Sequence, residues 1–124
     1  MENIHFGIDY SIVYIDFETC FENLEKINSF VMMYLYQCVN KNIKINLLTQ
    51  NKENVFKYLK NNKIDILLFN DLIEVERKNI KSNLTENSIL LSNDDELKNE
   101  IRNGNNEYYC FSNSIVEALI DWRA

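Results

Sequence analysis

Ile12-Val13-Tyr14-Ile15-Asp16-Phe17-Glu18-Thr19-Cys20 places an apolar run of β-branched and aromatic residues directly before two carboxylates. A short run of this kind, bounded by polar residues, is typical of a strand that is buried on both faces of a sheet. Asp16 and Glu18 then lie at the C-terminal end of that strand. In open α/β sheets, ligands bind outside this end of the strands.

Strand and helix patterns alternate along the rest of the chain. Further strands are predicted at residues 43–49, 65–69, 88–92 and 108–111, and helices at 22–41, 52–62, 94–102 and 115–122. Asn51 is a predicted helix cap, as is either Asp94 or Asp95, while residues 72–83 are ambiguous. The alternation predicts one α/β domain over residues 1–124. We expect a three-layer, Rossmann-like domain with a mainly parallel five-stranded sheet and helices on both faces, in which residues 1–10 form an arm or an extra strand.

Composition and charge argue against several classes of function. The 124 residues carry a formal net charge of -6, whereas sequence-independent nucleic-acid binding needs clustered Lys and Arg. No run of about 18 apolar residues predicts a membrane span, and no secretory signal is visible. Three cysteines without CxxC spacing predict reduced thiols in a cytoplasmic protein, and a single His argues against structural zinc. With two Gly and no Pro, turns must use Asn and Asp.

Polar groups also follow the other predicted strands. Thr49 ends the second strand, and Ser92-Asn93 followed by Asp94-Asp95 ends the fourth. Right-handed crossovers place the C-terminal ends of parallel strands along one edge of the sheet. The sequence therefore predicts that these groups meet Asp16 and Glu18 in a phosphate-handling site.

This ordered set of residues resembles the haloacid dehalogenase-like (HAD) superfamily over residues 12–122. Three further segments of the sequence support the resemblance, and they are Tyr34–Lys41, Ile43–Thr49 and Ile115–Asp121. The chain is most similar to small HAD domains without a cap domain that occur with surface-polysaccharide synthesis proteins, some beside ATP-grasp modules. The resemblance implies a capless domain and a protein partner of that kind.

The first motif of the family reads Asp-x-Asp-x-Thr. By resemblance, Asp16 is the nucleophile that forms an aspartyl-phosphate, and Glu18 protonates the leaving group and then activates water. Glu18 replaces the usual Asp, and its extra methylene moves the carboxyl group by roughly 1 Å, a misplacement that can cost about 10²-fold in rate. Cys20 stands where the family usually has Thr.

The remaining motifs are matched unevenly. The resemblance implies that Thr49 binds phosphoryl oxygens and that Lys78, or else Lys81, is the cation that neutralises nucleophile and phosphate. The family holds Mg²⁺ with Asp residues directly after the fourth strand, where this chain has Ser92 and Asn93. Mg²⁺ favours carboxylate and water oxygens, so this replacement should weaken its binding. The candidate metal ligands are Asp16, Glu18, Asp94 and Asp95.

Three functional hypotheses follow. The first is a HAD-like domain with a degenerate phosphatase site, weakly active or inactive, that acts as a binding or assembly module. The second is a Mg²⁺-dependent phosphatase that acts on a small phosphorylated metabolite. The third is a degenerate receiver domain of two-component signalling, with Asn70 in place of the phosphorylated Asp and Phe111 in place of a Lys.

Simpler roles are open for several of these residues. Thr49 and the Asp94–Asp95 pair can serve only as helix caps, which suits the helix dipole. Lys78 lies among other charged residues and can belong to a solvated surface. Tyr36 and Gln37 are candidates for an exposed contact surface.

Overall fold

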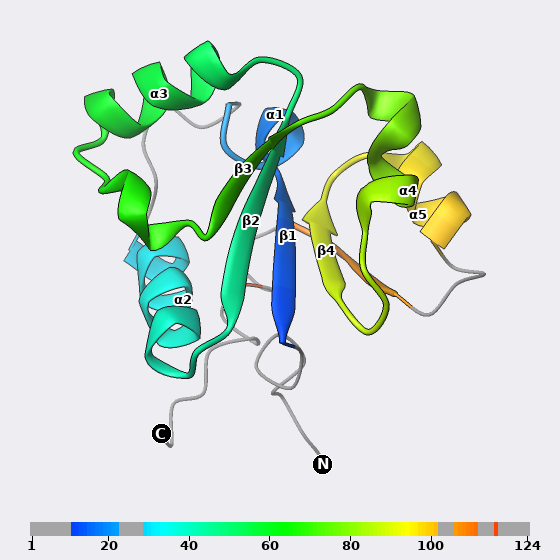
Figure 1. Cartoon of the computed structure of the whole chain (residues 1–124), viewed down its shortest axis with the longest axis horizontal. Coiled ribbons are helices and arrows are strands. Elements are labelled where there is room, and N and C mark those ends of the chain that lie inside the picture. The colour runs from blue at the N-terminus through cyan, green and yellow to red at the C-terminus, as the bar shows by residue number, and fades with distance from the viewer. Residues whose placement is uncertain (1–10, 23–28, 102–105, 112–115, 117–124) are drawn as a thin grey trace.

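Five parallel strands form one sheet in the order β3-β2-β1-β4-β5. The structure is a computed structural model, and it describes residues 11–22, 29–101, 106–111 and 116. The strands are β1 (Ile12–Asp16), β2 (Lys44–Thr49), β3 (Asp71–Glu74), β4 (Ile89–Ser92) and β5 (Glu107–Cys110). β1 lies in the centre and pairs with β2 on one side and with β4 on the other (Figure 1).

Side chains of the central strands alternate between two apolar layers. Val13 and Ile15 of β1 enter the larger core cluster, whereas Tyr14 between them enters the smaller one on the opposite face. All three are at most 2% exposed. The continuous apolar run of β1 is thus explained, because a strand in the middle of a three-layer domain is covered on both faces.

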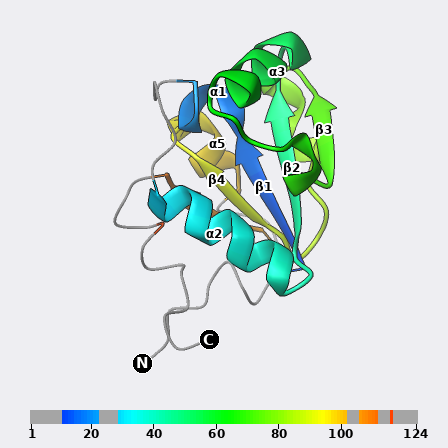
Figure 2. The same ribbon diagram turned by 90° about the vertical axis from the view of Figure 1, so that its left-hand side faces the viewer.

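Helices cover both faces of the sheet. The larger cluster packs α1 (Phe17–Cys20), α2 (Ser29–Asn40) and α3 (Lys52–Asn61) against the strands, while the smaller one packs α4 (Ile80–Asn83) and α5 (Asp95–Ile101) against the other face. Figure 2 shows α2 crossing in front of the strands and α5 behind them. The predicted three-layer, Rossmann-like α/β fold is confirmed.

The predicted third strand at 65–69 is wrong. Residues Ile66–Leu68 form a 3₁₀ turn, η1, which is capped because the Asp65 carboxylate accepts a hydrogen bond from the Leu67 backbone N–H. The strand β3 begins later, at Asp71, and most of it lies in the region 72–83 whose sequence was ambiguous. An apolar run predicted burial, yet the Leu67 side chain is 84% exposed. The short run Asp71–Glu74 pairs with β2 instead.

The helix predictions are confirmed in part. α3 begins after Asn51, whose side chain accepts a hydrogen bond from the Glu53 backbone N–H, as predicted. The predicted helix at 22–41 corresponds to α2, with residues 23–28 outside the described part of the chain. The predicted arm at 1–10 lies outside it as well, and of the predicted closing helix at 115–122 only Val116 is described, as helical and buried. No helix within the described residues is long and apolar enough to cross a membrane.

Asn residues replace Gly in tight turns, as the composition predicts. Asn42 has φ 62° in the turn after α2, and Asn87 has φ 58° in the turn before β4. Asn tolerates this left-handed backbone better than most residues with a side chain. Lys63, with φ 55°, occupies a third such position after α3.

Candidate functional site

The sheet reverses its winding direction between β1 and β4. From β1 the chain moves outward through β2 to β3, and it then crosses to β4 on the other side of β1 before it reaches β5. Ligand sites of open α/β sheets lie at such a switch point, outside the carboxyl ends of the strands. Asp16 ends β1 and Ser92 ends β4 at this position.

Asp16 is fully buried, with 0% exposure, and both of its oxygens are engaged. Arg77 donates to it in a bidentate manner, with Nη1 2.5 Å from Oδ1 and Nη2 2.7 Å from Oδ2. The hydroxyl groups of Ser92 and Thr19 also donate to Oδ2, at 2.7 Å and 2.9 Å. A buried carboxylate is tolerated only when it is paired and hydrogen-bonded in this way.

Arg77 joins Asp16 to a second carboxylate. It begins the 3₁₀ turn η2 (Arg77–Asn79), and its Nη2 also donates to Asp94 Oδ2 at 2.5 Å. The hydrogen bond to Asp16 is the largest cause that raises the pKa of Arg77, against an opposing effect of burial. A planar guanidinium with five N–H donors suits two carboxylates at once. The positive charge between Asp16 and Asp94 is thus supplied by the chain itself.

Asp94 serves two purposes in this cluster. Its Oδ1 accepts hydrogen bonds from the backbone N–H groups of Glu96 and Leu97 at the start of α5, which confirms the predicted cap. Burial acts to raise the pKa of Asp94, but the hydrogen bonds from Arg77 and from these N–H groups outweigh it, so that the pKa is lowered. The neighbouring Asp95 is exposed at the start of α5.

Ser92 and Asn93, which replace the expected Asp residues, hold the loops together. Ser92 Oγ donates to Asp16 and also accepts from the Asp94 backbone N–H at 3.0 Å. Asn93 donates from its side chain to the Thr19 carbonyl oxygen at 3.0 Å, and its backbone N–H donates to Thr19 Oγ1. These contacts connect the end of β4 to α1 with neutral groups.

Glu18 and Thr49 form a second pair beside the cluster. Thr49 Oγ1 donates to Glu18 Oε2 at 2.5 Å, and the Gln50 backbone N–H lies 3.3 Å from both carboxylate oxygens of Glu18. Arg77 Nη1 lies 3.9 Å from Glu18 Oε1. The hydroxyl at the end of β2 and the N–H that follows it therefore already donate to an anion, which is the carboxylate of Glu18.

Lys78 does not enter this cluster. Its side chain is 76% exposed and its Nζ lies 3.6 Å from Glu76 Oε2, and Lys81 is exposed on α4. The preceding residue, Arg77, supplies the cation instead. The sequence prediction missed it because a one-residue shift within a 3₁₀ turn changes which side chain points inward. One property of the residue type could have identified Arg77. The planar guanidinium of Arg donates two parallel N–H bonds to a carboxylate, a geometry that the ammonium group of Lys does not offer.

Cys20 lies close to Asp16, and its surroundings do not suit nucleophilic chemistry. The thiol donates to the Leu91 carbonyl oxygen at 3.3 Å and is buried. Burial, and then the negative charge of Asp16, raise the pKa of Cys20 well above the ordinary value for a thiol. A reactive cysteine needs the thiolate form, which this environment disfavours.

Two of the four residues predicted to hold Mg²⁺, Asp16 and Asp94, are paired with Arg77 in this structure. Within the described residues, no group of three or more His, Cys, Asp or Glu side chains is placed to hold a metal ion. Asp16 and Asp94 converge on the guanidinium of Arg77, whereas Glu18 accepts a hydrogen bond from Thr49.

The geometry differs from that of a receiver domain. Receivers have the strand order 2-1-3-4-5, whereas the order here is β3-β2-β1-β4-β5. Asn70, which was expected in the position of the phosphorylated Asp, precedes β3, and its backbone N–H donates to the Ile45 carbonyl oxygen at 2.7 Å. Asn70 thus lies at the N-terminal end of β3, whereas Asp16 lies at the C-terminal end of β1.

Comparisons with protein-family models, with curated proteins and with solved structures each found no match for this chain. The class of the protein is therefore defined by its own fold and site. It is a three-layer α/β domain with a parallel sheet and a buried carboxylate–guanidinium cluster at the switch point.

Proposed function

We propose that the chain is a HAD-like domain without phosphatase activity that acts as a binding or assembly module. Its partner class, by resemblance, is a protein of surface-polysaccharide synthesis. The observation that carries the proposal is the pairing of Arg77 with both oxygens of Asp16 and with Asp94. Under this proposal, the guanidinium takes the role of the positive charge that a metal ion supplies in an active member of the superfamily.

A carboxylate nucleophile must present a free oxygen to the phosphorus atom. Each oxygen of Asp16 instead accepts a hydrogen bond from Arg77, and Oδ2 accepts two more from Ser92 and Thr19. To release Asp16, the protein must break a charge-assisted bidentate pair and leave a buried carboxylate without its counter-ion. Truncation of a buried pair typically costs several kcal/mol, which opposes attack by Asp16.

The pair of Glu18 and Thr49 supports the same conclusion. Electrostatic stabilisation of a transferring phosphoryl group needs donors that are aimed at its oxygens. Here Thr49 and the Gln50 N–H donate to Glu18, so a phosphate would have to displace one negative charge and remain close to others. The binding of an anionic substrate is disfavoured by both effects.

The competing proposal is a Mg²⁺-dependent phosphatase that acts on a small phosphorylated metabolite through an aspartyl-phosphate. One observation favours it: Asp16, Glu18 and Thr49 meet at one edge of the sheet, as that chemistry requires. This proposal needs Arg77 to leave Asp16 and Mg²⁺ to bind between Asp16 and Asp94. The two proposals thus differ in whether the wild-type protein binds Mg²⁺.

The test is a titration of the ¹⁵N-labelled protein with Mg²⁺ and then with beryllofluoride, which mimics a phosphoryl group on a carboxylate. We expect the amides of Asp16, Thr49 and Asp94 to remain unchanged at millimolar Mg²⁺. Saturable shifts at these amides that disappear in Asp16→Asn would overturn the binding-module proposal and support the phosphatase.

Arg77→Ala is the informative variant for the same titration, with Lys78→Ala as its matched control. The variant leaves Asp16 and Asp94 facing each other without a counter-ion, a pair of oxygen donors that attracts a hard divalent cation. We expect Mg²⁺ to shift the Asp16 and Asp94 amides in Arg77→Ala and not in Lys78→Ala. Identical spectra for both variants would argue against Arg77 as the substitute for the metal.

A further inference from the structure

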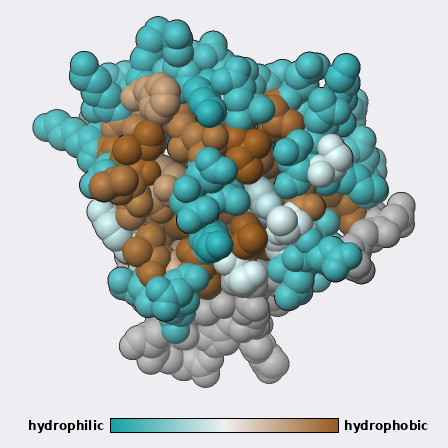
Figure 3. Space-filling model, viewed as in Figure 1, coloured by the Kyte–Doolittle hydropathy of each residue, from teal (hydrophilic) through white to brown (hydrophobic). Residues whose placement is uncertain are grey.

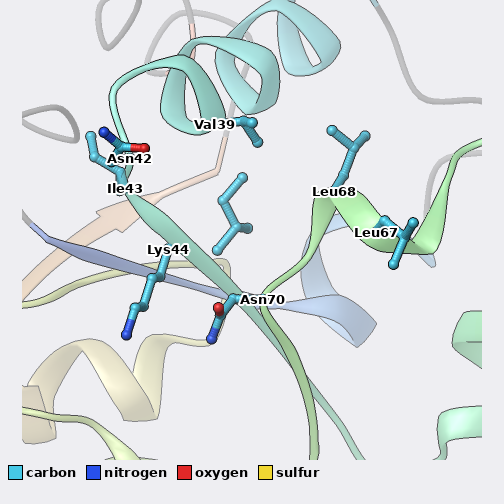
Figure 4. Close-up of a pocket in the computed structure, with 8 residues that line it drawn as sticks. Val39, Asn42, Ile43, Lys44, Leu67, Leu68 and Asn70 are labelled. Atoms are coloured by element: carbon cyan, nitrogen blue, oxygen red, sulfur yellow. The ribbon is translucent and has the colours of Figure 1, made fainter.

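We draw no further inference here: the strongest candidate, the open pocket of about 370 Å³ between α2 and η1 at the N-terminal ends of β2 and β3 (Figure 4), with exposed apolar side chains beside it (Figure 3), carries no proposal because nothing in the structure shows what covers this apolar surface.

Discussion

The sheet differs between the edge formed by the C-terminal ends of its strands and the edge formed by their N-terminal ends. The difference is whether the side chains there have partners. At the C-terminal edge, the charged side chains of Asp16, Arg77 and Asp94 bond to one another and to nearby hydroxyl and N–H groups. At the N-terminal edge, the side chains of Val39 and Leu67 remain uncovered around an open pocket. Fold rules place ligands at the first edge, yet the second edge is the one left open. The difference indicates that the position where the fold favours a ligand is closed here by the side chains of the chain itself, whereas apolar side chains are left exposed at the opposite edge.

The largest expected effect comes from opening the closed edge. Arg77→Met removes the counter-ion of a fully buried carboxylate, and we expect it to lower the free energy of unfolding by about 3 kcal/mol, near the lower end for broken buried pairs because Arg77 is partly exposed. Urea unfolding at neutral pH measures it. Lys78→Met, next in sequence but exposed, should change stability by less than about 0.5 kcal/mol.

A double variant separates pairing from packing. In Arg77→Met/Asp16→Asn both charges are absent, so the buried carboxylate no longer lacks a partner, and part of the lost stability should return. If Arg77→Met is as stable as the wild-type protein, the closed edge is not held together by this pair. The proposed difference between the two edges would then be contradicted, because the charged pair would not stabilise the C-terminal edge.

The sequence predicted where the strands end better than it predicted which side chains pair there. Asp16, Glu18 and Thr49 were placed correctly at one edge because strand periodicity and right-handed crossovers fix where parallel strands end. Arg77 was missed since it lies on a 3₁₀ turn, where no period shows which side chain points inward. The run Ile66–Leu68 was predicted as a strand because its apolar residues suggest burial, while the structure leaves Leu67 exposed. Exposed apolar residues mislead a prediction that equates apolar with core.

A smaller effect is expected at Asp94, which ties α5 to the closed edge. Asp94→Ala removes the helix cap and one partner of Arg77, and we expect a loss of about 1 kcal/mol, the usual value for a cap. Thermal or urea unfolding measures it, with Asp95→Ala as the control. Equal effects of the two substitutions would contradict the role of Asp94 in the cluster.

The pH dependence of stability provides a separate check on Asp94. Its pKa is lowered in the folded protein below the ordinary value of 3.8, so the folded state binds this proton less tightly than the unfolded state does. The resulting stability is present above the ordinary pKa and is lost as the pH falls through the lower, folded-state pKa. In Asp94→Ala this part of the acid-induced loss should be absent, whereas Asp95→Ala should retain it.

The smallest expected effect belongs to the open edge. Leu67→Asp replaces a side chain that is 84% exposed and should change the free energy of unfolding by less than about 0.5 kcal/mol. Urea unfolding of Leu67→Asp and of Arg77→Met under the same conditions gives the comparison. We expect the apolar Leu67 to contribute little to the free energy of unfolding and the charged Arg77 to contribute more. A loss from Leu67→Asp as large as that from Arg77→Met would mean that η1 is part of the core. The open pocket beside Leu67 would then belong to the packing of the fold, since a side chain that is truly exposed contributes little to the free energy of unfolding.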